Sequence, residues 1–314
     1  MNYLKDYREG EKFVGTYLCK QKQILKTKAG KTYYSLTLQD KTGTADGKIW
    51  ELNNGIANFE PMDYIHCEGM VTSFQGNLQM NISRVRISDE GEYDPADYVP
   101  CTNKDVGEMF SRILKYVASV QNKYLRKILK MYFVENKEFV DAFKKHSAAK
   151  SVHHGFMGGL LEHTLSVTDM CQYFAEHYPM IHRDLLITAA LFHDMGKIQE
   201  ISDFPMNDYT DDGQLLGHIY IGARCMENAA AQIPNFPPKL KNELVHCILA
   251  HHGKMEFGSP KVPAIMEAMA LHMADNADAK LQTLTEVFTQ AGDNMGWLGF
   301  NRMFESNLRK TSEE

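Results

Sequence analysis

The sequence predicts a multidomain protein in which an all-β barrel is followed by an all-α domain. Alternating apolar residues separated by turn residues fill the first part of the chain, whereas apolar residues recur every three to four positions from Asp105 onward. An acidic stretch with two prolines, 91–104, separates the two patterns and is expected to be a linker. We therefore expect one domain at 1–90, a second at 105–308 and a loose tail at 309–314.

The composition is that of a globular protein outside the membrane. It is 44% hydrophobic and 24% charged, with a net charge of −6. No apolar run approaches the ~20 residues that a membrane-spanning helix needs. The N-terminus has no apolar signal segment, and six widely spaced cysteines form no CxxC pair. We therefore expect a cytoplasmic location with reduced thiols, and neither disulfides nor zinc fingers.

Five short strands are expected in the N-terminal domain. They are predicted at 13–18, 33–38, 48–50, 64–67 and 80–85, with a short helical or irregular connection at 54–63. Turn-forming residues lie between the strands. Five short strands in a small domain fit a closed barrel of the OB-fold type.

The barrel has features of a single-stranded nucleic acid site. Residues 11–50 carry eight lysines against three acidic residues, a local charge of +5. OB-folds hold single strands by stacking bases on aromatic side chains in a cationic groove. The residues expected to bind substrate are Tyr33, Tyr34, Trp50, Lys26, Lys28 and Lys31. Two alternatives stay open, namely that the lysines form a solvated face and that the aromatic rings fill the barrel core.

The second domain contains histidines and aspartates at positions that helical periodicity predicts to be buried. His163 lies on an apolar stripe, and His193–Asp194 directly follow the apolar run 185–192. Asp275 lies on a further apolar stripe. A buried aspartate without a partner costs several kcal/mol, and a shared cation would remove that cost.

Further polar residues flank this set in the sequence. His218 is expected to begin one helix and His251 to end another, so both can converge on the same cation from the opposite side. Gly196 is expected to let the chain turn. Lys197 would bring a positive charge to the site where a phosphate could meet the metal, although a solvated lysine at a helix end is the alternative.

The order of these residues resembles a known family. His163, His193–Asp194, His218, His251 and Asp275 follow the H…HD…H…H…D ligand order of the HD-domain phosphohydrolases. A barrel before such a domain, the sequence GGLLEHT at 158–164 and HHG at 251–253 are similar to the YhaM-type 3′–5′ exoribonuclease family. This similarity extends over nearly the whole chain.

The resemblance implies a two-metal site with Asp194 and Lys197 as catalytic residues. One metal would be bound by His163, His193, Asp194 and Asp275, and Asp194 would bridge to a second metal bound by His218 and His251. His252 would be either another ligand or a group facing the phosphate. His153 and His154 would contribute to the substrate pocket, and Lys197 would stabilise charge on the phosphate oxygens.

Nitrogen and oxygen ligands without thiolate suit Mn²⁺, Co²⁺, Fe²⁺ or Zn²⁺, and the resemblance implies manganese with cobalt as a substitute. The expected activity is 3′–5′ hydrolysis of single-stranded RNA, and also of single-stranded DNA, to nucleoside 5′-monophosphates by metal-activated water. The alternatives are hydrolysis of a small nucleotide (a dNTP, a cyclic dinucleotide or an alarmone) and a non-catalytic nucleic-acid-binding protein. A homo-oligomer is compatible with the sequence.

Overall fold

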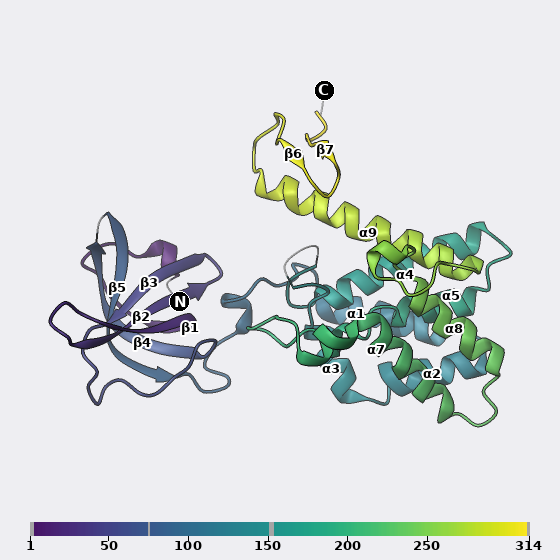
Figure 1. Ribbon diagram of the computed structural model, residues 1–314, viewed down its shortest axis with the longest axis horizontal. Coiled ribbons are helices and arrows are strands. Elements are labelled where there is room, and N and C mark those ends of the chain that lie inside the picture. Colours follow the sequence, from purple (N-terminus) through teal and green to yellow (C-terminus); the bar gives the residue numbers. More distant parts are fainter. Residues whose placement is uncertain (1–2, 75, 151–153, 313–314) are drawn as a thin grey trace. The chain divides into compact units, whose positions relative to one another are not determined.

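The computed structural model describes residues 3–74, 76–150 and 154–312 (Figure 1). The chain divides into two compact units. The first comprises Met1–Cys101 with Phe204–Met206, and the second comprises Thr102–Asp203 with Asn207–Glu314. Within the described residues, no helix combines the length and the apolar character that crossing a bilayer requires.

The first unit is a closed barrel of five strands, which confirms the expected OB-type fold. Its strands are β1 (Lys12–Lys26), β2 (Thr32–Asp40), β3 (Gly43–Ile49), β4 (Tyr64–Phe74) and β5 (Asn77–Ile87), in the order β1-β2-β3-β5-β4. Neighbouring strands are antiparallel except β3 and β5, which pair in parallel. The connection at 54–63 is irregular and contains no helix.

Most of the strands are longer than their apolar patterns predicted. β1 continues to Lys26 because its polar second half still pairs with β2, in a register that ends at Lys26 and Thr32. Trp50 was expected within the third strand but follows directly after it. Backbone pairing, which the side-chain pattern does not report, sets these ends.

Alternate side chains of the strands fill the barrel interior. Leu36 and Leu38 of β2 point inward, and so do Ile65 and Cys67 of β4. Tyr17 of β1 is also fully buried, and its hydroxyl lies 3.2 Å from that of Tyr7. Tyr17 therefore belongs to the core.

The second unit is helical. Its longer helices are α1 (Val106–Ser119), α2 (Lys123–Phe133), α3 (Lys137–Lys145), α4 (Gly159–His177), α5 (Arg183–Phe192), α7 (Asp211–Ala231), α8 (Pro238–Ala250) and α9 (Met266–Gln290), with the short α6 at Lys197–Glu200. Every residue of α5 from Leu185 to Phe192 is buried. α5 packs against α4, α8 and α9 and also contacts α1 and α2, so it lies at the centre of the packing of this unit.

Side chains cap several of these helices at the positions where they begin. The Asp105 carboxylate accepts the backbone N–H of Glu108 at 2.7 Å, which explains why the helical pattern starts at this residue. Asn136 caps α3 in the same way through the N–H of Phe139. Each cap satisfies a backbone donor that the first turn of the helix leaves without a partner.

The end of the chain differs from the expectation that helices continue to about residue 308. α9 ends at Gln290, and Gly292 then adopts a positive φ of 52°. A two-stranded hairpin follows, formed by β6 (Phe300–Asn301) and β7 (Ser306–Asn307). The reason is the cluster of glycine, aspartate and asparagine at 292–294, which favours a turn over a helix.

Replacing a central aromatic residue should destabilise the helical unit. Phe133 is fully buried between the rings of Phe139, Phe143 and Phe192. Phe133→Ala should therefore lower the free energy of unfolding by about 3–5 kcal/mol, measured by urea unfolding with far-ultraviolet circular dichroism. The control Leu215→Ala, at a side chain that is 81% exposed, should change it by less than ~0.5 kcal/mol. Equal midpoints for the two variants would contradict this packing.

Candidate metal centre

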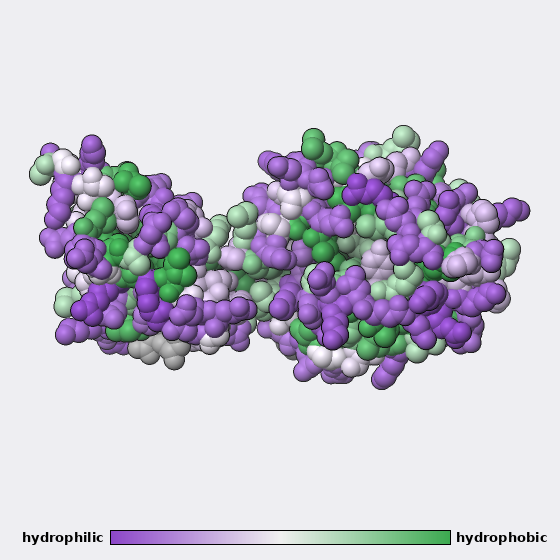
Figure 2. Space-filling model, turned by 90° about the horizontal axis from the view of Figure 1, so that it is seen from below, coloured by the Kyte–Doolittle hydropathy of each residue, from purple (hydrophilic) through white to green (hydrophobic). Residues whose placement is uncertain are grey.

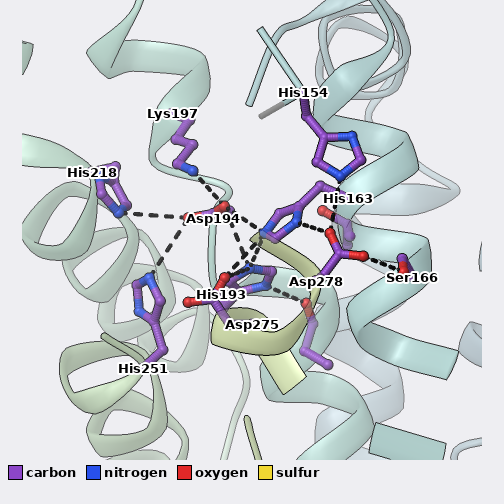
Figure 3. A network of polar contacts seen from close by, with 12 residues as sticks. His154, His163, Ser166, His193, Asp194, Lys197, His218, His251, Asp275 and Asp278 are labelled. Atoms are coloured by element: carbon purple, nitrogen blue, oxygen red, sulfur yellow. Dashed lines mark hydrogen bonds and ion pairs between the residues drawn. The ribbon is translucent and has the colours of Figure 1, made fainter. Parts of the chain in front are cut away.

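Residues from five segments of the helical unit meet at one buried point (Figure 3). α4 contributes His163, and the turn after α5 contributes His193 and Asp194. The remaining predicted residues come from α7, from the end of α8 and from α9, and they are His218, His251, His252 and Asp275. The structure thus brings together all seven residues predicted as metal ligands.

Asp194 lies at the centre of this group and is only 2% exposed. Its Oδ2 atom lies 3.3 Å from Nε2 of His163 and 3.4 Å from Nε2 of His193. Its Oδ1 atom faces the opposite side, 3.5 Å from Nε2 of His218 and 3.6 Å from Nε2 of His251. The two oxygens of one carboxylate therefore divide the group into two halves.

Each half could hold a cation. In the first half, ligand atoms of His163, His193 and Asp275 lie within 4.8 Å of one another, and in the second half those of His218, His251 and His252 do so. Several of these atoms are buried without a hydrogen-bond partner among the described residues, namely Oδ1 of Asp194 and Nε2 of His218 and His251. Unpaired buried polar atoms of this kind are expected where an ion binds.

The histidines point Nε2 toward the centre because their Nδ1 atoms are hydrogen-bonded to groups on the side away from it. Three of them donate Nδ1–H to backbone carbonyls, which accept only, so Nε2 keeps its lone pair in the neutral ring. These bonds run from His193 to Ala190 (2.7 Å), from His251 to Ile248 (2.6 Å) and from His252 to Phe257 (2.8 Å).

Two carboxylates that sequence reasoning missed hold the remaining histidines. Asp278 accepts Nδ1–H of His163 at 2.7 Å, and Glu200 accepts Nδ1–H of His218 at 2.9 Å. Asp278 could have been found, because it lies three positions after Asp275 and so on the same face of a helix. Glu200 gives no comparable signal, since its contact depends on how α6 packs against α7.

Groups of opposite charge at the centre stabilise one another. Burial alone would raise the pKa of Asp194, but Lys197 and His193 outweigh it and hold that pKa well below its usual range. Burial likewise disfavours the charged form of His163, yet the carboxylates of Asp194, Asp275 and Asp278 raise its pKa well above the usual value. The aspartates are therefore ionised, and His163 carries a proton that an ion must displace.

Lys197 is not solvated, because its side chain is only 12% exposed. Its Nζ atom lies 2.7 Å from Oδ2 of Asp194. Burial alone would lower the pKa of Lys197, but the adjacent carboxylate raises it, so the ammonium group stays charged.

The chain turns at residues 193–196, as expected, but Gly196 makes no use of the left-handed conformation that glycine favours. Its φ of −64° and ψ of −20° are helical values that any residue adopts. A Cβ atom at this position would instead lie 2.1 Å from the carbonyl oxygen of His218. Glycine is therefore required for a close backbone contact. The positive φ in this region belongs to Gly217 (72°), which breaks α7 so that His218 opens a new helical segment.

His154 lies away from the central group. Its ring is 2% exposed, donates Nε2–H to Asp278 at 2.9 Å and packs against the ring of His163 with centroids 5.3 Å apart. The expected contribution of His154 to the substrate pocket stays a prediction. His153, the other histidine predicted in this segment, lies outside the described residues.

The predicted strand-binding residues of the barrel differ in their surroundings. Tyr33 and Trp50 stack with ring centroids 4.7 Å apart, and Trp50 is 40% exposed. Tyr34 instead packs against Phe59 at the barrel core. The three lysines are exposed. Figure 2 shows apolar patches among hydrophilic side chains on the visible face of the barrel.

Residues 160–280 match the HD domain family. The chain is also similar to proteins named 3′-5′ exoribonuclease YhaM. It is 32% identical over 257 residues to the one from Geobacillus sp. (strain WCH70), covering 81% of this chain and 78% of that protein. It is 32% identical over 262 residues to the one from Bacillus subtilis (strain 168), covering 81% of each. The identity is again 32%, over 293 residues and 90% of each chain, for the one from Listeria innocua.

A solved structure also matches, with a TM-score of 0.24 and 20% identity. It is the second OB-fold domain of replication protein A from Methanococcus maripaludis, and the match covers 29% of this chain and 98% of that one.

Binding of a divalent ion should release protons and weaken at low pH. The raised pKa of His163 means that the neutral ring is scarce below that pKa, so the affinity should fall about tenfold per pH unit for each proton displaced. Calorimetric titration with Mn²⁺ at one pH in two buffers of different ionisation enthalpy measures this release. Identical heats in the two buffers would contradict it.

Proposed function

Because this chain belongs to the YhaM family of 3′–5′ exoribonucleases, we propose that it degrades single-stranded RNA to nucleoside 5′-monophosphates at a two-ion site centred on Asp194. It is a metal-dependent 3′–5′ exoribonuclease. That membership decides against the small-nucleotide hydrolase and the non-catalytic protein. The observation that carries the proposal is the division of ligands by the two oxygens of Asp194.

The ligand assignment follows the two halves of the site. His163, His193 and Asp275 would bind one ion, and His218, His251 and His252 would bind the other. Asp194, which has one carboxylate oxygen facing each half, would contribute to both. Two bound divalent ions would supply an acidified water and neutralise charge at phosphorus. Manganese is the ion we propose, because imidazole and carboxylate ligands suit it and no thiolate is present in the site.

Lys197 is proposed to act on the phosphate. Its ammonium group is charged, shielded from water and adjacent to Asp194. A fixed positive charge in a site of low dielectric stabilises an oxygen on which negative charge develops. Lys197 would therefore favour the transition state over the ground state of the scissile phosphate.

The barrel is proposed to bind the strand. The exposed Trp50 is held in place by its stack with Tyr33 and by donation of its indole N–H to Asn81 at 2.9 Å. A rigid exposed ring is a platform on which a base can stack, and the lysines at 26, 28 and 31 would neutralise phosphates. Single-stranded DNA could use the same platform. We propose that the protein works in the cytoplasm.

Removing the central carboxylate charge should abolish hydrolysis. Asp194→Asn keeps the size of the side chain but would lower the affinity of the site for both ions. The kcat should therefore fall on the order of 10³-fold or more. The measurement is Mn²⁺-dependent cleavage of 5′-labelled single-stranded RNA, on which the native protein should give a stepwise ladder shortened from the 3′ end. Asp293→Asn, at an exposed position of the same unit, should cleave normally. Near-normal cleavage by Asp194→Asn would refute the site.

Removing the exposed indole of Trp50 should weaken binding of the strand more than it slows the hydrolysis step. Trp50→Ala should raise KM for a long single strand about five- to a hundredfold, as expected for the loss of one stacked base. Turnover of a dinucleotide, which would use the metal centre of the helical unit alone, should not change.

Tyr173→Ala is the matched control, because this aromatic side chain is 61% exposed but lies on α4 of the other unit. It should leave both kinetic constants unchanged. An unaltered KM for Trp50→Ala would show that Trp50 does not contact the strand.

A further inference from the structure

The five histidines of the metal centre are held in two different ways. Three donate Nδ1–H to backbone carbonyls, as described above, whereas His163 and His218 donate to carboxylates. One histidine–carboxylate pair lies in each half of the centre. A carboxylate partner makes an imidazole a stronger ligand than a carbonyl does, because it stabilises positive charge on the ring.

In the first half, both carboxylate oxygens of Asp278 accept hydrogen bonds. Its Oδ2 atom accepts Nδ1–H of His163 at 2.7 Å and Nε2–H of His154 at 2.9 Å, and its Oδ1 atom accepts the hydroxyl of Ser166. It contacts His163 on the ring nitrogen opposite the centre (Figure 3). Asp278 therefore acts on the ion through His163 and does not face it.

The bonds to Asp278 also fix which nitrogen of His163 is free. An ionised carboxylate only accepts hydrogen bonds, so Nδ1 must carry the hydrogen and Nε2 must offer its lone pair once the ring is neutral. Ser166 lies on the same helix as His163, and its hydroxyl bond keeps the carboxylate from rotating. The ring is thus fixed in both tautomer and direction.

Glu200 performs the matching task in the second half. It is the last residue of α6, it is buried, and its Oε1 atom accepts both the backbone N–H (3.0 Å) and Nδ1–H (2.9 Å) of His218. The first of these bonds holds the chain next to the break at Gly217. Glu200 therefore positions both the backbone and the ring of this ligand.

We propose that Asp278 and Glu200 are positioning residues, each of which sets the affinity of one ion independently of the other. Asp278 acts through His163 on the ion of the first half, and Glu200 acts through His218 on the ion of the second half. The inference rests on the proposed two-ion function. It adds two residues outside the predicted ligand set and states which ion each controls.

Mn²⁺ titration of the full-length protein tests this directly, by calorimetry and by electron paramagnetic resonance. The native protein should bind two ions and show the signal of a spin-coupled pair. Asp278→Asn and Glu200→Gln should each lower the affinity of one ion about 10- to 100-fold and leave the other within about twofold. At intermediate Mn²⁺, each variant should therefore show the signal of a single uncoupled ion.

Double variants identify which ion each residue controls. Asp278→Asn should add little to the loss of Mn²⁺ affinity caused by His163→Ala, because both substitutions act on one ligand. Its effect should add in full to the loss of affinity caused by His218→Ala. Glu200→Gln should show the reverse pattern. Glu267→Gln is the matched control, since this buried glutamate accepts the N–H of His182 at 2.6 Å and contacts no residue of the centre.

The outcomes separate the inference from the function on which it rests. If the native protein binds fewer than two ions, the two-ion function fails. If it binds two but either variant binds both ions normally, or loses both equally, the positioning assignment is overturned. Should Asp278→Asn fail to fold, Ser166→Ala offers a second test, because it removes one hydrogen bond to the same carboxylate. It should still lower the affinity for one ion severalfold. Unchanged binding by Ser166→Ala would then overturn the role of Asp278.

Discussion

The buried charge of Asp194 is the constraint on which the helical unit depends. An ionised carboxylate shielded from water costs several kcal/mol unless other groups compensate it. Here an ammonium group and four imidazoles surround it. His193 and Lys197 are close to Asp194 in sequence, but His163, His218 and His251 come from α4, α7 and the end of α8, so the carboxylate is fully compensated only when these helices pack around α5. Folding of the unit and assembly of the site are therefore one event.

The buried stretch of α5, Leu185–Phe192, makes this arrangement precise. Because Leu185–Phe192 are all buried, the helix end that presents His193 and Asp194 is fixed on every side. Side chains supported by a packed helix vary less in position than those on a free loop. The barrel has a different design, since its stacked rings lie at the surface, where a strand of varying sequence must be accommodated.

A feature of the fold or of the site could be predicted from the sequence when the residues that produce it are close together in the chain. Most of the residues proposed as ligands could be chosen from the sequence because they lie on an apolar stripe or at a helix end, and both features can be seen within a few residues. Glu200 was missed because its partner lies 18 positions away and on another helix. The helical pattern was extended too far beyond Gln290, since the apolar residues of the terminal hairpin recur at spacings that a helix also allows. Such errors arise where backbone pairing decides the structure.

The absence of a side chain at Gly196 limits how this centre could be redesigned. The backbone beside Asp194 touches the carbonyl of His218, and a Cβ atom would also approach the nitrogen of Gly222 to 2.9 Å. Even a methyl group would push α7 outward and carry a ligand of the second half away from the shared carboxylate. Gly196 thus fixes the separation between the two halves. To increase the separation between two bound ions, or to fit a larger metal, an engineer would have to redesign the contact between α6 and α7. The residues proposed as ligands could stay unchanged.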